Sequence, residues 1–267
     1  MTLETHDDGR VRVITINRPA QRNAVDPATA QRLFDAFMAF DADDTVDAAV
    51  LTGAQGAFCA GFDLKAAADG VARDWIAQVD IPGGWDDAMA QPLPGPMGPS
   101  RLMLRKPVIA AVEGHAVAGG LELAAWCDMR VAADDAVFGV FCRRWGVPLI
   151  DGGTVRLPRI VGQGRANDMI LTGRAVTADE AVAIGLADRR VAPGQALPAA
   201  LELARDLTRF PQGCMRADHL SARLSPRALA AALTREWASL GTFEQEGIAG
   251  AARFAAGAGR SGRFDGA

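Results

Sequence analysis

The sequence predicts an α/β fold in which β-β-α units repeat as a spiral, followed by a helical C-terminal subdomain. Short apolar strand patterns alternate with helical periodicity in the first part of the chain. Two similar glycine-containing turns follow two of these strands, and the pattern is helical from Ala196 onward. We therefore expect a spiral core over residues 1–192 and a helical subdomain over residues 193–267.

The first strand and helix are predicted close to the N-terminus. Residues Val11–Ile16 come close to alternation of apolar and polar side chains and end at Asn17-Arg18-Pro19, which is typical of a strand that runs into a turn. Residues 27–40 then carry apolar side chains at helical spacing. A strand followed by a helix is thus expected to open the fold.

Further strands are predicted from short apolar runs. Residues 48–52 and 107–112 are mostly apolar and end at glycine-containing turns, which is typical of strands that are buried on both faces. Residues 129–132 predict a third such strand, and residues 136–139 follow it. The rhythm of strands and turns agrees with stacked β-β-α units.

The turns after two of these strands resemble each other. Ala60-Gly61-Phe62-Asp63-Leu64 follows the strand at residues 48–52, and Ala118-Gly119-Gly120-Leu121-Glu122-Leu123 follows the strand at residues 107–112. This similarity indicates an internal repeat. Residues 82–99 instead carry nine proline and glycine residues and predict a long loop, which fits a lid over a binding site and a surface insertion equally well.

The composition narrows the class of protein. The 267 residues are 49% hydrophobic and 22% charged, which suits a buried core and excludes global disorder. The net charge is −4 and the 28 basic residues include only two lysines, so no nucleic-acid partner is expected. The four cysteines lie far apart without a CxxC pair, so neither a disulfide framework nor a metal site is expected.

Targeting and cofactor signals are not found in the sequence. The N-terminal segment has neither the apolar core of a signal peptide nor an arginine-rich transit pattern, and no window reaches the roughly 18 apolar residues of a membrane span. We therefore expect a cytoplasmic protein without membrane contact. No Walker A sequence occurs, and no GxGxxG follows the first strand, so nucleotide-dependent chemistry is not indicated.

The repeated turns suggest a chemical role. A strand that ends in a glycine-containing turn and opens a helix leaves backbone N–H groups free at the helix N-terminus, where the peptide dipoles favour negative charge. Two such turns in a spiral repeat can direct N–H groups at one oxygen, which is the arrangement that stabilises an oxyanion or enolate. Glu122 lies in apolar surroundings near the start of its helix, so it is a candidate general acid or base; the alternative is a carboxylate that only complements the helix dipole.

Five stretches of the chain resemble the enoyl-CoA hydratase/isomerase, or crotonase, family. They occur in family order and at family spacing up to about residue 190, and they are Asn17 to Ala24, Ala57 to Lys65, Glu113 to Ala124, Gly152-Gly153-Thr154 and Leu171-Thr172-Gly173. The resemblance implies a crotonase-like spiral and an acyl-CoA thioester substrate, with no cofactor because coenzyme A is part of the substrate. It implies enoyl-CoA hydration, a lyase reaction, or enoyl-CoA isomerisation in fatty-acid or related acyl-CoA metabolism.

The resemblance also assigns residues and an assembly. The backbone N–H groups of Phe62 and Gly119 would form the oxyanion hole. The positions that it places around coenzyme A and the substrate are Arg22, Ala24, Ala60, Asp63, Leu64 and Lys65. A homotrimer or hexamer is implied, and apolar stripes on the predicted C-terminal helices are expected to support it, at Leu201, Leu203, Ala204 and Leu207 and at Leu229, Leu233 and Trp237.

One residue departs from the family pattern. Cys142 stands where hydratases carry a second glutamate, so a mechanism with two glutamates does not transfer unchanged. Asp151 aligns with an aspartate of the dienoyl-CoA isomerase branch and is the candidate partner of Glu122, although an aspartate before Gly-Gly is also an ordinary turn or cap residue. A non-catalytic acyl-CoA-binding homologue therefore remains the alternative. RNA binding is disfavoured by the acidic pI near 5.4.

Overall fold

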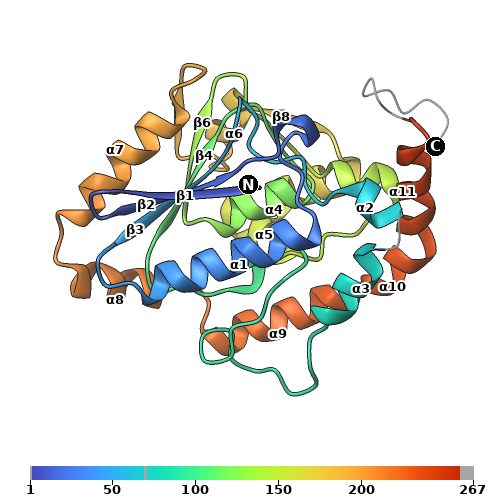
Figure 1. Ribbon diagram of the computed structural model, residues 1–267, viewed down its shortest axis with the longest axis horizontal. Coiled ribbons are helices and arrows are strands. Elements are labelled where there is room, and N and C mark those ends of the chain that lie inside the picture. The colour runs from blue at the N-terminus through green and yellow to red at the C-terminus, as the bar shows by residue number, and fades with distance from the viewer. Residues whose placement is uncertain (1, 69–70, 259–267) are drawn as a thin grey trace.

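A computed structural model describes residues 2–68 and 71–258, and its centre is a six-stranded sheet (Figure 1). The strand order is β1-β2-β3-β4-β6-β9. β1 pairs antiparallel with β2, and all other neighbouring strands are parallel. The strands are β1 Leu3–Asp8, β2 Val11–Ile16, β3 Ala48–Gly53, β4 Val108–Val112, β6 Met129–Ala133 and β9 Arg189–Val191.

The two faces of this sheet bury different side chains because successive residues of a strand point to opposite sides. Val50 and Ile109 pack with α7 (Ala196–Thr208) in one apolar cluster. Leu51 and Val112 belong to the larger cluster on the other face, beneath α1 (Pro27–Ala42) and α4 (Gly119–Trp126). In Figure 1, α7 and α1 lie on opposite sides of the sheet.

A smaller sheet completes the repeated units. It has the order β5-β7-β8, with β5 His115–Val117 parallel to β7 Val137–Gly139 and β7 antiparallel to β8 Ala175–Thr177. β4, β5 and α4 form one β-β-α unit, and β6, β7 and α5 (Gly153–Thr172) form the next. The predicted α/β spiral of β-β-α units is therefore confirmed.

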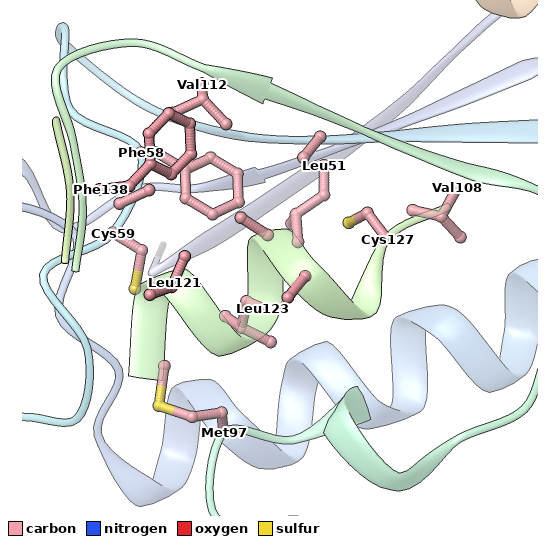
Figure 2. Packing of buried hydrophobic residues seen from close by; sticks show 14 of the residues in the cluster. Leu51, Phe58, Cys59, Met97, Val108, Val112, Leu121, Leu123, Cys127 and Phe138 are labelled. Carbon is pink, nitrogen blue, oxygen red and sulfur yellow. The ribbon is translucent and has the colours of Figure 1, made fainter. Parts of the chain in front are cut away.

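The first turn of α4 is embedded in the main core (Figure 2). Leu121 points from this helix toward Phe58 and Phe138, Leu123 lies on another side of the helix, and all four side chains are inaccessible to solvent. A helix whose side chains are buried nearly all round cannot shift without opening the core. The core thus fixes the position of the backbone at the start of α4.

The segment between β3 and β4 is mostly irregular. It contains α2 Leu64–Ala68, α3 Val71–Gln78 and the 3-10 helix η2 Pro99–Arg101. No helix or strand interrupts residues 82–98 in this described stretch, so the predicted long loop is confirmed. Trp75 Nε1 donates to Pro96 O at 3.0 Å, which ties the end of the loop to α3.

The remaining elements surround these sheets. Two 3-10 helices, η1 and η3, span Pro19–Gln21 and Phe141–Trp145, and α6 spans Ala178–Ala183. The C-terminal part is helical, with α8 Gln212–Ala222, α9 Pro226–Trp237, α10 Leu240–Thr242, the π-helical turn η4 Phe243–Gly247 and α11 Ile248–Ala255. α11 packs beside α2, at the right of Figure 1. Among the described residues, no helix is both long and apolar enough to span a membrane.

The apolar stripes of the C-terminal helices are used within the chain. Leu203 and Ala204 are buried against the six-stranded sheet, and Leu229, Leu233 and Trp237 are buried as well. The expectation that these stripes support assembly is therefore wrong for their buried members, because their apolar surface is already covered by the chain's own core. The homotrimer or hexamer rests on the family resemblance alone and stays a prediction.

Candidate active site

A cavity of about 490 Å³ lies at the start of α4 and gathers segments that are distant in sequence. Its wall contains every residue that the sequence assigned to a site, namely Phe62, Gly119, Glu122, Asp151, Arg22, Ala24, Ala60, Asp63, Leu64 and Lys65. Four aromatic side chains, Phe141, Trp145, Phe243 and Phe254, form another part of the wall. The chain thus brings the predicted residues together, while their roles stay predictions.

Two polar side chains, the buried Asn23 and the partly buried Arg18, tie together segments that carry residues of the cavity wall. Asn23 is inaccessible to solvent, and its Nδ2 donates to Ala54 O at 2.8 Å and to Ala57 O at 2.7 Å. Arg18 forms an ion pair with Asp63 at 3.0 Å. The segments that carry Arg22 and Asp63 are therefore tied to each other, and the Asp63 carboxylate is engaged with Arg18 rather than free for a ligand.

The two repeated turns are in direct contact. Gly61 has φ +96°, and a Cβ there would lie 2.9 Å from Ala118 Cβ and 3.0 Å from Gly119 N. A Cβ on Gly120 would lie 2.0 Å from Cys59 O, so only glycine fits at that crossing. Glycines at both positions therefore let the first turn approach the backbone of the second as closely as it does.

The N–H groups of Phe62 and Gly119 are the free donors of these turns. Beside Phe62, Gly61 O accepts from Val25 N and Asp63 N donates to Val25 O, so the intervening N–H of Phe62 points away from Val25. Gly119 is the first residue of α4 and has no intrahelical acceptor for its N–H. Neither N–H has an acceptor within residues 2–68 and 71–258, and both residues line the cavity.

Glu122 stands in the first turn of α4 and is only 3% exposed. Its Oε1 accepts from the backbone N–H groups of Asp151 and Gly153, both at 2.9 Å. No described residue donates to the second oxygen, Oε2. Burial, followed by the nearby charges of Asp151 and Glu236, raises the pKa of Glu122 well above its ordinary value.

Asp151 precedes α5 and is also 3% exposed. Its Oδ1 accepts from Met97 N at 2.9 Å and from the Ser100 hydroxyl, while Oδ2 has no donor among the described residues. Burial raises the pKa of Asp151, but the bonds from Ser100 and Met97 act in the opposite direction. The neighbouring charges also differ, because Arg101 and Arg156 lower the pKa of Asp151 whereas Asp151 and Glu236 raise that of Glu122, so ionisation is opposed more strongly at Glu122.

The position of Cys142 in the cavity agrees with a packed thiol. Cys142 lines the wall and is 7% exposed, and burial raises the pKa of its thiol to about 12. A thiol with this pKa stays protonated near neutral pH. Cys142 therefore cannot supply the second carboxylate that its position in the family pattern would carry.

Basic side chains form part of the cavity wall. Arg22, Lys65, Arg144 and His115 all line it. Burial lowers the pKa of His115, and the neighbouring charge of Arg22 acts in the same direction. The guanidinium of Arg144 packs over the Phe141 ring at 3.9 Å. The basic side chains of Arg22 and Lys65 suit this part of the cavity to a polyanionic ligand.

Sequence reasoning missed the residues that support the carboxylates. Ser100 and Met97 come from the loop before β4, and Glu236 comes from α9. Arg156 donates to Asp151 O at 3.0 Å and to Ser100 O at 2.7 Å. Arg156 lies five residues after Asp151, whereas Ser100, Met97 and Glu236 are more than 50 residues from their partners, and only the three-dimensional fold brings these together.

Comparison with known proteins gives a consistent match. The family model described as enoyl-CoA hydratase/isomerase matches residues 6–255. An enoyl-CoA hydratase of Mycobacterium tuberculosis is 40% identical over 203 residues, covering 73% of this chain and 70% of that protein. A carnitinyl-CoA dehydratase of Salmonella arizonae is 40% identical over 209 residues, covering 77% of this chain and 74% of that protein. The solved structure of a carnitinyl-CoA dehydratase from Mycobacterium avium superposes with a TM-score of 0.77 at 30% identity, covering 93% of this chain and 94% of that one.

Proposed function

Because the chain belongs to the enoyl-CoA hydratase/isomerase family and is an enzyme of the hydratase (lyase) type, we propose that it adds water across the double bond of a 2-enoyl-CoA thioester. The observation that carries this proposal is the placement of Glu122 and Asp151 in one cavity with the free N–H groups of Phe62 and Gly119. Carboxylates and amide donors at one substrate are what thioester enolate chemistry needs.

The coenzyme A part of the substrate is assigned to the basic side of the cavity. Arg22 and Lys65 are the partners for its phosphates, because both are basic side chains that line the wall. Ala24, Ala60 and Leu64 contribute packing and backbone groups beside them. The acyl chain then extends past Glu122 toward the aromatic residues of the wall.

The two free amides act on the thioester carbonyl. When water attacks the double bond, negative charge moves to the thioester oxygen, and the N–H groups of Phe62 and Gly119 stabilise it. Gly119 stands at the N-terminus of α4, whose dipole favours the same charge. Donors that are fixed before the reaction stabilise the enolate without further reorganisation.

The carboxylates move the protons. Ionised Asp151 accepts a proton from water through its free oxygen as the water oxygen bonds to the β-carbon of the substrate, and the electron pair of the double bond shifts toward the thioester. Protonated Glu122 then donates its proton to the α-carbon, and the carbonyl reforms. A pair of carboxyl groups whose environments push their pKa values apart is suited to these opposite roles.

Double-bond isomerisation is the second candidate function. It is favoured by Cys142, which removes the glutamate that positions water in family hydratases, and by Asp151, which the resemblance assigns to the isomerase branch. The same two carboxyl groups would then remove a proton from one carbon and return it to another. No water enters the product of that reaction.

A panel of acyl-CoA thioesters tests these alternatives. The purified protein is incubated with saturated, 2-unsaturated and 3-unsaturated acyl-CoAs of several chain lengths, and mass spectrometry follows the products. We expect a product heavier by one water from 2-unsaturated substrates. A double-bond shift without a change of mass would favour the isomerase, and binding without turnover of any substrate would favour the non-catalytic acyl-CoA-binding alternative.

A further inference from the structure

Glu236 is a buried carboxylate that the proposed chemistry does not use. It lies near the end of α9 and is 6% exposed. Its Oε2 accepts from Gly152 N at 2.6 Å, and its Oε1 accepts from Thr154 N at 2.8 Å and from Thr154 Oγ1 at 2.7 Å. Both oxygens accept hydrogen bonds. Burial raises the pKa of Glu236, whereas the bonds from Thr154 and Gly152 and the charge of Arg156 act in the opposite direction and favour the carboxylate.

Glu236 and Glu122 share one turn of backbone. The N–H groups of Asp151 and Gly153 donate to Glu122, and those of Gly152 and Thr154 donate to Glu236. Four consecutive N–H groups at the start of α5 thus alternate between two buried carboxyl groups. The position of this turn fixes the backbone of Asp151 and the two N–H groups that donate to Glu122.

We propose that Glu236 is a positioning residue, which holds the first turn of α5 from the side opposite Glu122 and so keeps Glu122 and Asp151 in their reactive arrangement. Glu236 comes from the C-terminal helical part, whereas Glu122 comes from α4 in the spiral. The inference rests on the proposed function in that the pair is taken to move protons. It assigns Glu236 no contact with the substrate.

The charge of Glu236 also acts on the proton of Glu122. It is the third cause of the raised pKa of Glu122, after burial and Asp151. The other charged or titratable groups that interact with Glu122, Glu236 or Asp151 come from several segments, and they include Arg101 of η2, Arg156 of α5, Cys142 of η3 and Cys59, which precedes α2. Removal of the Glu236 charge therefore lowers the pKa of Glu122, because a like charge no longer opposes its ionisation.

The test compares Glu236→Gln with a control on the same helix. Glutamine keeps one acceptor, but its NH₂ group meets a backbone N–H at the start of α5, so one anchor of the turn is lost. The control is Ser225→Ala. It removes the side-chain cap at the start of α9, where Ser225 Oγ accepts a hydrogen bond from Ala228 N, and it leaves the carboxylates untouched. Turnover of a 2-enoyl-CoA, Tm and the pH profile of kcat/KM are measured for each protein.

We expect Glu236→Gln to lower kcat about 10- to 100-fold with KM within about threefold of wild type, because a small misplacement of reacting groups slows the chemical step. The alkaline limb of the pH profile, where Glu122 loses its proton, should move about 1 unit to lower pH. Ser225→Ala should lower Tm by about 2–4 °C and leave kcat and the limb unchanged. A lower Tm in Glu236→Gln with unchanged kcat and limb would overturn the proposal.

Two further measurements cover the remaining outcomes. Glu236→Asp keeps the charge but is one methylene shorter, so it should lower kcat without moving the limb; if Glu236→Gln does not fold, wild-type kcat in Glu236→Asp overturns the inference. If the wild-type protein does not hydrate any 2-enoyl-CoA, the proposed function fails separately. In that case the pKa of Glu122 is measured by carbon NMR of protein labelled at glutamate, in wild type and in Glu236→Gln. An equal pKa in the two proteins contradicts the role of Glu236.

Discussion

Asp151→Asn tests the division of labour between the two carboxyl groups with little disturbance of the fold. Asparagine has nearly the shape of aspartate, and its Oδ1 can still accept from Met97 N and the Ser100 hydroxyl. The substitution replaces the free oxygen by an NH₂ group that cannot accept a proton from water. The backbone N–H of residue 151, which donates to Glu122, is retained.

The expected loss follows from the two roles of the Asp151 charge. Loss of a positioned general base costs about 10²-fold or more in kcat, which is about 2.7 kcal/mol of transition-state stabilisation. In addition, the charge of Asp151 raises the pKa of Glu122. Its removal lowers that pKa, so a smaller fraction of the Glu122 carboxyl groups carries the proton that the reaction needs. KM should change little, because the residues assigned to coenzyme A are untouched.

The assay is steady-state hydration of a 2-enoyl-CoA by wild type, Asp151→Asn and Ser100→Ala. The serine variant removes one hydrogen bond to Oδ1 but keeps the carboxylate, so we expect it to retain at least about a tenth of the wild-type rate, a smaller loss than that of the base itself. Near-wild-type kcat in Asp151→Asn would refute the reasoning. Asp151 would then be only a cap for the loop that carries Met97 and Ser100.

Five further variants and one measurement of size extend these tests. Gly119→Pro removes the N–H at the first position of α4, where proline is otherwise compatible with a helix, and should abolish turnover. Gly119→Ala keeps the N–H and brings its Cβ against the flexible Met97 side chain, as proline also does, so it should stay active. Phe62→Ala also keeps its N–H and should stay active. Because the folded-state pKa of Glu122 is raised, the folded protein keeps a proton that the unfolded chain releases, and the free energy of unfolding falls as pH rises above about 4. Glu122→Gln should lose this part of the pH dependence when Tm is measured at a series of pH values. The same slope of Tm against pH in the variant and in wild type would contradict the prediction. Cys142→Ala should keep kcat within about twofold, since a buried protonated thiol takes no part in proton transfer; a large loss of turnover would return a catalytic role to the thiol. Light scattering should give a homotrimer or hexamer, and a stable monomer at micromolar concentration would count against the assembly.

Much of the spiral could be predicted because its strands carry regular apolar patterns. The strand predicted at Val11–Ile16 has those bounds in the structure, and the run at residues 48–52 differs from β3 by one residue. β1 was not predicted, because Leu3–Asp8 has the sequence LETHDD and lies at the edge of the sheet, where one partner strand suffices and most side chains are exposed. Periodicity finds strands that bury a face, and this strand buries little.

Some residues of the candidate site could be predicted from the sequence, and others could not. Phe62, Gly119 and Glu122 could be selected from the sequence, because glycine-containing turns that open helices have a local signature. Glu236 was not selected, although it follows Leu233 by three residues and Leu229 by seven and so lies on the buried face of α9, because its partner Gly152 is far away in the sequence. Contacts of this kind depend on how α9 packs across α5, which no local pattern encodes.

The most direct test of the account is the source of the oxygen in the product. Wild-type protein is incubated with a 2-enoyl-CoA in water labelled with heavy oxygen, beside Glu122→Gln and Asp151→Asn, and the products are analysed by mass spectrometry. The account predicts a hydroxyacyl-CoA that carries one labelled oxygen at the β-carbon, formed at least about 10²-fold more slowly by each variant. An unlabelled product of unchanged mass, or equal rates of labelling in all three proteins, would contradict it.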